Sequence, residues 1–186
     1  ALHIATTGRP GPVVIDVPKD IQEKIVESYH DPALHLPSYQ PTVEPNGLQV
    51  KKILKQLSHA QKPVILAGGG VNYADANKEL VAFAERYRIP VVSTLLGLGA
   101  MPIEHELSLA MGGMHGSYAA NMAMDQADYI INIGARFDDR LTGNPTTYAP
   151  NATVAHIDID PAEIGKVVKT AIPVVGDAKA TLKALL

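Results

Sequence analysis

Short apolar runs rich in Val and Ile alternate with helical segments along most of this 186-residue chain. Runs that predict strands lie at residues 63–67, 90–94, 129–133, 154–159 and 172–175. Apolar residues at helical spacing predict helices at residues 48–59, 74–88 and 117–126, and from residue 178 onward. Such runs indicate strands buried on both faces, as in parallel sheets. Because crossovers between parallel strands are right-handed, we expect an α/β fold with a doubly wound parallel sheet of five or six strands flanked by helices.

The first part of the chain lacks this alternation. Residues 13–17 predict one short buried strand, which Pro18 ends because proline cannot donate a ladder hydrogen bond. Residues 31–47 contain four prolines and few apolar side chains, which predicts a semi-rigid linker. One strand cannot form a sheet alone, so we expect residues 1–30 to be the C-terminal remnant of a preceding domain. Residues 48–186 are then one Rossmann-like nucleotide-binding domain, and the missing initiator Met suggests a piece of a longer protein.

Composition argues against several classes of function. A net charge of −3 gives no electrostatic reason to bind nucleic acid or an anionic membrane. No apolar run approaches the roughly 18 to 20 residues that span a bilayer. The absence of cysteine excludes disulfides and thiolate chemistry and favours a cytoplasmic protein. None of the seven histidines has a zinc-motif spacing, and the chain has neither a nucleophile elbow nor a P-loop, so we expect no metal site.

Glycine-rich or charged loops follow five of the expected strands, and in a parallel sheet they meet at one edge, where α/β proteins bind ligands. The most charged of them is Gly134–Arg140, whose two arginines can pair with phosphate or carboxylate and whose aspartates can accept from ribose hydroxyls. Gly68–Gly70 and Met111–Gly116 let backbone approach a ligand closely. A nucleotide explains these loops together better than a set of independent turns does.

Acidic residues after other strands have two interpretations. Asp158 and Asp160 alternate with Ile159 and can face the same ligand. For Asp160 we favour a simpler role, that of capping a short helix that begins at Pro161. Asp177, after the last expected strand, belongs to the same class.

The standard dinucleotide fingerprint is incomplete. Tyr73 stands where the third glycine of G-x-G-x-x-G would be, and Ser93-Thr94 replaces the acidic residue that binds a ribose after the second strand. An NAD-binding redox domain is therefore a weaker alternative. A scaffold domain without nucleotide affinity also stays open.

Several segments resemble the thiamine diphosphate enzymes. Gly8–Asp20 resembles the end of their pyrimidine-binding domain. Gly113–Gly116, Gly134–Gly143 and His156–Lys166 are similar to the central domain of the acetolactate synthase family of large catalytic subunits. The resemblance covers nearly the whole chain. Its Arg-Phe-Asp-Asp-Arg run favours the FAD-containing biosynthetic enzymes over the FAD-free catabolic ones, and also over glyoxylate carboligase and pyruvate oxidase.

The resemblance implies an extended FAD that takes no net redox part in the reaction. The residues implied to contact it are Arg9, Gly68, Gly69, Thr94, Leu95, Gly112, Gly113, Met114, His115, Gly134, Arg136, Asp138, Asp139, Arg140, Asp158, Ile159 and Asp177. Arg140 is also implied to recognise the carboxylate of the second 2-oxoacid. The full-length enzyme is implied to decarboxylate pyruvate on thiamine diphosphate and Mg²⁺. It would then join the two-carbon unit to pyruvate or 2-oxobutanoate, which begins branched-chain amino-acid biosynthesis.

Two parts of the family's machinery are not found in these residues. The glutamate of the pyrimidine-binding domain is absent, and Gly176-Asp177-Ala178 is not the Gly-Asp-Gly motif that helps to hold Mg²⁺. We therefore expect no catalytic residue and no metal site in this chain, no activity of the chain alone, and weak or absent FAD retention. The implied partners are other domains of the same polypeptide, further copies in a homodimer or homotetramer, and a small regulatory subunit.

Overall fold

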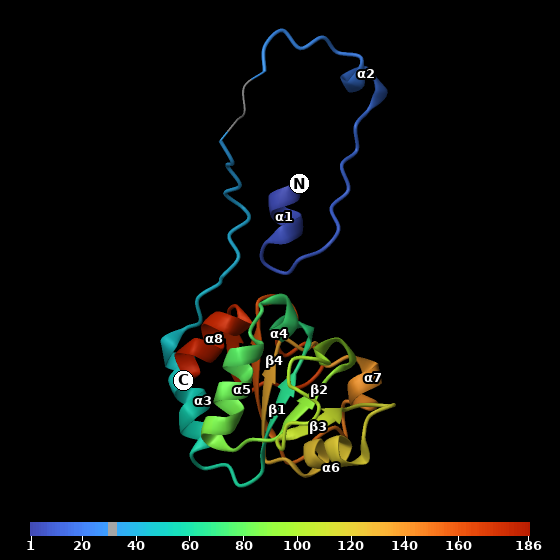
Figure 1. Ribbon diagram of the computed structural model, residues 1–186. Coiled ribbons are helices and arrows are strands. Elements are labelled where there is room, and N and C mark those ends of the chain that lie inside the picture. Colours follow the sequence, from blue (N-terminus) through green and yellow to red (C-terminus); the bar gives the residue numbers. More distant parts are fainter. Residues whose placement is uncertain (30–32) are drawn as a thin grey trace. The chain divides into compact units, whose positions relative to one another are not determined.

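The computed structural model describes residues 1–29 and 33–186, which form two compact units, Ala1–Pro41 and Thr42–Leu186 (Figure 1). All strands of the described residues belong to the second unit. The expected boundary between the domain remnant and the linker, at residues 30 and 31, lies outside the described residues.

The described part of the first unit contains two short helices, α1 (Leu2–Thr6) and α2 (Lys19–Gln22), and neither has a buried residue. The strand expected at residues 13–17 is not formed, and Val14 is 91% exposed. That prediction was wrong because a strand needs a hydrogen-bonding neighbour, which the described part of this unit does not offer. The Tyr39 hydroxyl donates to the Thr7 carbonyl at 2.7 Å and joins the two ends of the unit.

The second unit is built on a six-stranded sheet in which every pair of neighbours is parallel. Its order is β3-β2-β1-β4-β5-β6. The strands are β1 (Pro63–Ala67), β2 (Val91–Ser93), β3 (Ser108–Met111), β4 (Tyr129–Ile133), β5 (Thr153–Asp158) and β6 (Ile172–Val175). This confirms the predicted doubly wound α/β fold. The chain leaves β1 toward one edge and returns at β4 to build the other half, so the topological switch point lies between β1 and β4.

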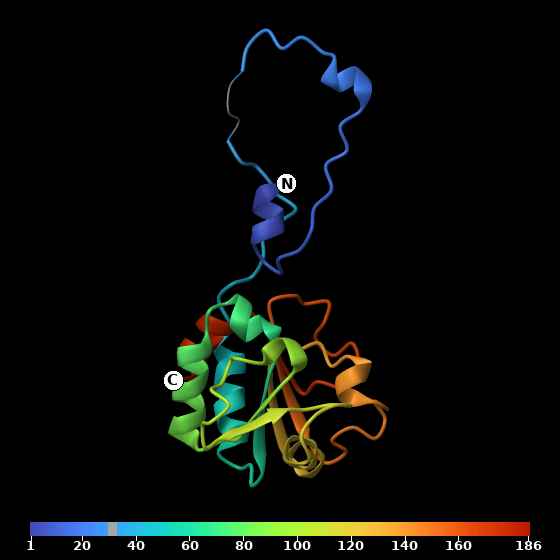
Figure 2. The ribbon, with the colours of Figure 1, turned by 45° about the vertical axis from the view of Figure 1, so that its right-hand side comes forward.

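Helices cover both faces of the sheet (Figures 1 and 2). One face carries α3 (Gly47–Leu57), α4 (Gly69–Tyr73), α5 (Asn77–Tyr87) and α8 (Ala178–Leu185). The other face carries α6 (Tyr118–Gln126) and α7 (Asp139–Thr142), and the short 3₁₀ helix η1 (Leu95–Gly97) follows β2. Among the described residues, no helix has the length and apolarity that crossing a membrane requires.

Two apolar cores result from the alternation of side chains along the strands. Ile131 and Ile133 of β4 join the core under α3, α5 and α8, whereas Ile130 joins the core under α6 and α7. The same alternation places Asn132 and His156 on the face of Ile130, and both polar side chains are fully buried there.

Four local elements differ from the sequence expectations. The edge strand β3 and the short helices α4 and α7 were not predicted. No helix forms after Pro161, where residues 161–165 are turns. Asp160 caps the first of these turns, because its Oδ1 accepts from the Ala162 N–H at 3.0 Å. The expectation that Asp160 caps a helix was therefore wrong, because Asp160 caps a turn.

Candidate functional site

The loops after β1 and β4 are joined by backbone hydrogen bonds at the switch point. The Gly68 N–H donates to the Ile133 carbonyl at 2.9 Å, and the Gly70 N–H donates to the Gly134 carbonyl at 3.1 Å. The Gly134 N–H in turn donates to the Ile157 carbonyl of β5 at 2.8 Å. The structure therefore brings together the glycine loop and the charged loop that the sequence singled out separately.

Most of the glycines in these loops are required by the close approach of the protein's own segments. A Cβ on Gly68 would lie 2.1 Å from the Gly134 oxygen, and Gly134 has φ +64° with Gly70 Cα 2.6 Å from its Cβ position. Gly113 has φ +103°, and its Cβ position is 2.6 Å from the Arg140 oxygen. Sequence reasoning assigned these glycines to ligand approach and missed the packing between loops. Their contact with a nucleotide remains a prediction.

The charged loop exposes its polar side chains and buries its apolar one. Arg136, Asp138, Asp139 and Arg140 are exposed, whereas Phe137 is buried with φ +55°. Asp138 caps α7, because its Oδ1 accepts from the N–H of the third residue on, Leu141, at 3.1 Å. Arg140 Nε lies 3.9 Å from Asp139 Oδ2, a weak contact between two exposed groups. Both arginines are thus exposed to solvent at the carboxyl edge of the sheet.

The loop after β3 reaches the same place. The Met114 N–H donates to the Arg140 carbonyl at 2.8 Å, and the Asn121 side chain bonds both the N–H and the carbonyl of Gly113, at 2.8 and 2.9 Å. The side chains of Met114 and His115 are exposed in this loop. Soft apolar, cationic and carboxylate groups are therefore neighbours at this edge.

The remaining predicted residues have local structural roles or lie elsewhere. Thr94 caps η1 through Gly97, next to the exposed Leu95, and Gly69 lies against the Leu96 side chain. Gly112 packs against Met124 and Val92, and Asp177 caps α8. Ile159 follows β5 and is half-buried. Arg9 belongs to the first unit, so its part in this site remains a prediction.

A hollow of about 300 Å³ lies beside α8, away from the β1–β4 switch point. It is lined by Glu44, Asp177, Lys179, Ala180 and Lys183, of which only Asp177 was predicted. Its lysines are already paired, Lys179 with Asp75 at 3.1 Å and Lys183 with Glu79 at 4.0 Å. The hydrogen bond to Asp75 raises the pKa of Lys179. We therefore place the candidate site at the switch point and not in this hollow.

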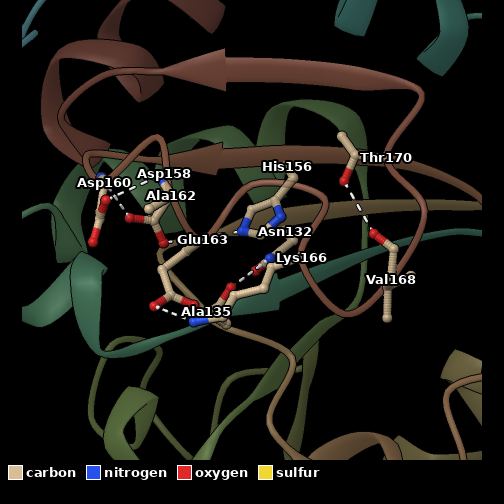
Figure 3. A network of polar contacts seen from close by, with 10 residues as sticks. All are labelled: Asn132, Ala135, His156, Asp158, Asp160, Ala162, Glu163, Lys166, Val168 and Thr170. Carbon is tan, nitrogen blue, oxygen red and sulfur yellow. Dashed lines mark hydrogen bonds and ion pairs between the residues drawn. The ribbon is translucent and has the colours of Figure 1, made fainter.

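A buried polar network supports the charged loop from below (Figure 3). Asn132 Nδ2 donates to the Ala135 carbonyl at 2.7 Å. Its register partner on β5, His156, stacks its ring edge-to-face on Phe137, with centroids 5.2 Å apart. His156 Nε2 lies 3.9 Å from Asp158 Oδ2. Sequence reasoning did not single out Asn132, although a polar residue inside an apolar run was a visible signal.

The groups at this edge fit a nucleotide. Guanidinium groups bind phosphate, carboxylates accept from ribose hydroxyls, and exposed apolar side chains cover a ring. Asp158, at the end of β5, is nearly buried, and its Oδ1 accepts from the Asp160 N–H at 2.9 Å. Within residues 1–29 and 33–186, no three His, Asp or Glu side chains gather into a group that could hold a metal ion.

We expect His156 to make the unit less stable in acid. Burial lowers its pKa from 6.5 to about 4, against smaller opposing effects of the Ala135 backbone and of Glu163. Between these values the unfolded chain binds a proton that the folded chain does not, so stability falls as the pH drops from 6.5 to 4, by on the order of 3 kcal/mol. Urea unfolding of the chain at several pH values measures this loss.

Matched variants assign the acid effect to this ring. His156→Gln cannot titrate, so its unfolding free energy should change less between pH 6.5 and 4 than that of the wild type. His59→Gln, at an exposed histidine, should keep the wild-type slope. An equal slope in His156→Gln and wild type would show that other groups cause the acid sensitivity.

Comparison with known proteins adds independent findings. Residues 50–185 match the family model described as the thiamine pyrophosphate enzyme, central domain. The chain is 58% identical over 186 residues to the acetolactate synthase large subunit of Lactococcus lactis subsp. lactis, covering 100% of the chain and 32% of that protein. It is 50% identical to the acetolactate synthase large subunit of Corynebacterium glutamicum, covering 100% of the chain and 30% of that protein. It is 53% identical over 189 residues to a probable acetolactate synthase large subunit of Methanocaldococcus jannaschii, covering 100% and 32%. The chain spans about a third of the length of the curated relatives it matches.

Proposed function

The chain belongs to the family of the thiamine pyrophosphate enzyme central domain, and we propose that it is the FAD-binding part of an acetolactate synthase large subunit. Relatives of that name match it over its whole length. The proposed activity of the whole enzyme is the decarboxylation of pyruvate and the joining of its two-carbon unit to pyruvate or 2-oxobutanoate. This reaction needs thiamine diphosphate and Mg²⁺, which we assign to parts of the protein outside these residues.

The observation that carries the FAD proposal is the meeting of loops at the switch point. In doubly wound sheets the crevice at that point binds nucleotides. Here the loops after β1 and β3 both contact the loop after β4, and two exposed arginines, Arg136 and Arg140, lie on this last loop. A flavin nucleotide uses cations, carboxylates and apolar surface together, which is the combination that these loops offer.

The groups at this edge then have proposed roles. Arg136 and Arg140 bind the pyrophosphate, and Arg140 also recognises the carboxylate of the acceptor 2-oxoacid. Asp138 and Asp158 accept from hydroxyl groups, and Met114 and Leu95 cover ring surface. When bound, the flavin holds this edge together and takes no net redox part in the carboligation.

An NAD-binding redox domain is less well supported. Such a domain carries an acidic residue after its second strand. At that position β2 ends in Ser93, and Thr94 uses its hydroxyl to accept from the Gly97 N–H at 3.1 Å and so caps η1. Glyoxylate carboligase, another thiamine diphosphate enzyme, remains the second candidate within the family.

The proposed partners follow from the same assignment. They are the other domains of the polypeptide, further copies in a homodimer or homotetramer, and a small regulatory subunit. We propose a cytoplasmic location and no partnership with nucleic acid or a membrane, in keeping with the net charge of −3.

A segment exchange tests the function directly. This chain replaces the matching residues of the Lactococcus lactis large subunit, to which it is 58% identical. We expect the chimera to purify yellow with bound FAD and to form acetolactate from pyruvate. A chimera that folds and assembles but retains no flavin would refute the FAD assignment. One that binds flavin but forms no acetolactate would refute the assignment to this enzyme.

The isolated chain should behave differently from the chimera. We expect it to form no acetolactate, because the family's catalytic glutamate and Gly-Asp-Gly motif are not among its residues. We also expect a colourless preparation with weak FAD affinity, measured by quenching of flavin fluorescence. Stoichiometric FAD that survives purification of the isolated chain would contradict the second expectation.

A further inference from the structure

Asn132 occupies a position where packing alone favours an apolar residue. It lies in the middle of the central strand β4, between Ile131 and Ile133, and is 0% exposed. Its register partner His156 is also 0% exposed. Among the described residues, Asn132 Oδ1 has no hydrogen-bond partner, whereas the His156 ring interacts with the Ala135 backbone. A buried polar atom without a partner reduces stability, so a gain in stability does not explain an asparagine at this position.

The side-chain N–H group of Asn132 does make a hydrogen bond, and this bond indicates the role of the residue. Its Nδ2 donates to the carbonyl of Ala135 at 2.7 Å, three residues ahead in the charged loop (Figure 3). This bond turns the chain back over β4 directly before Arg136. Phe137 follows in the left-handed region, with φ +55°, and is held edge-to-face by the rings of His156 and Tyr148.

The loop is thus fixed from inside at two residues, one on each side of Arg136. Ala135 is held by a hydrogen bond and Phe137 by aromatic packing, and both side chains are buried. Arg136 lies between them and is exposed. Anchoring on both sides fixes the backbone of Arg136, and with it the direction of the Cα–Cβ bond from which the side chain starts.

We propose that Asn132 is a positioning residue, which fixes the Ala135 carbonyl and thereby aims Arg136 at the phosphate groups of the flavin nucleotide. The proposal rests on the proposed function of the site. Asn132 itself is buried beneath the loop and does not touch the ligand. His156 supports the arrangement as the ring against which Phe137 packs.

Substitutions at Asn132 separate positioning from a merely structural role. Asn132→Leu fills the site but cannot donate to Ala135, and we expect it to raise the FAD Kd of the chimera at least tenfold. Asn132→Asp can donate through its protonated form, which burial favours. At pH 5.5 we expect it to bind FAD at least fivefold more tightly than Asn132→Leu. The neighbouring titratable groups, His156, Asp158 and Glu163, are the same in both variants.

A second readout does not need the flavin. Hydrogen exchange of the isolated chain should show faster amide exchange in residues 134–140 of Asn132→Leu than of wild type, by at least tenfold. Ile130→Val, on the same strand and face, serves as the control and should leave both the exchange of this loop and the FAD Kd within twofold of wild type.

The outcomes distinguish the two proposals. If the wild-type chimera binds no FAD, the proposed function fails, and loop exchange still decides whether Asn132 positions the loop. Equal loop exchange in Asn132→Leu and wild type would overturn the inference, as would equal FAD binding by Asn132→Asp and Asn132→Leu at pH 5.5. If Asn132→Leu does not fold, the comparison of Asn132→Asp with wild type between pH 5.5 and 8.5 replaces it. If the FAD affinity of Asn132→Asp, divided by that of wild type, is higher at pH 5.5 than at pH 8.5, the inference is supported. If this ratio is low and the same at both pH values, the inference is overturned.

Discussion

Replacement of Gly68 by alanine is expected to destabilise the Thr42–Leu186 unit strongly. The new Cβ would lie 2.1 Å from the Gly134 oxygen, 2.4 Å from the Gly134 carbonyl carbon and 2.6 Å from Ala135 Cα. All three atoms are backbone, so no side-chain rotation relieves the clash. The β1 and β4 loops must separate, which also breaks the bond from the Gly68 N–H to Ile133.

Overpacking a core typically costs 1–3 kcal/mol, and a backbone clash at two central strands should cost at least about 3 kcal/mol, a large part of the roughly 5–15 kcal/mol that stabilises a typical domain. Urea unfolding of the chain measures the loss. Gly47→Ala is the matched control, because nothing lies within 4 Å of its Cβ position and it begins α3. It should be neutral or stabilising by up to about 1 kcal/mol. If Gly68→Ala unfolds at the same urea concentration as wild type and Gly47→Ala, the loops are not packed as described.

The second large effect concerns Arg136 and Arg140. Charge-assisted hydrogen bonds contribute about 1.5–3 kcal/mol each, and exposure places these two near the lower limit. Removing both guanidinium groups, in Arg136→Ala/Arg140→Ala, should therefore raise the FAD Kd of the chimera on the order of 100-fold. Flavin content after gel filtration and a fluorescence titration measure the change.

Arg86→Ala provides the control for lost positive charge. Arg86 lies in the last turn of α5, a helix that leads into β2 and so ends at the opposite edge of the sheet. This variant should retain FAD as wild type does. Retention of flavin by the double variant, with wild-type affinity, would move the nucleotide away from the β4 loop.

The strands could be predicted where a run rich in β-branched residues ends at a glycine or at a change of composition. Residues 63–67, 129–133 and 172–175 match β1, β4 and β6 to the residue. The edge strand β3 was missed because Ser108–Met111 is short, only half-buried and irregular in its pairing with β2. The helix expected after Pro161 does not form, because local hydrogen bonds favour turns instead. In these bonds the side chains of Asp158 and Asp160 accept from backbone N–H groups two residues on.

The meeting of the loops could be predicted from the sequence, but the reasons for it only in part. Strand ends in a parallel sheet necessarily share an edge, so the loops could be grouped from sequence. The reason for the glycines could not, because Gly68 and Gly134 are 66 residues apart along the chain and meet only in the folded sheet. The role of Asn132 was hidden for a similar reason, since it depends on the loop turning back over its own strand.

The β1–β4 pairing has a consequence for how the molecule folds. The strands β1, β2 and β3 form one half of the sheet, and β4, β5 and β6 form the other. In the described part of the chain, the halves of the sheet pair through β1 and β4, along Pro63–Ala67 and Tyr129–Ile133. The loops after β1 and β4 bond to each other across this pairing, so the proposed nucleotide edge is complete only when both halves have docked. A ligand bound there spans the seam between the halves and stabilises only molecules in which both have docked. Flavin binding at the proposed site would then report that the two halves of the sheet have docked.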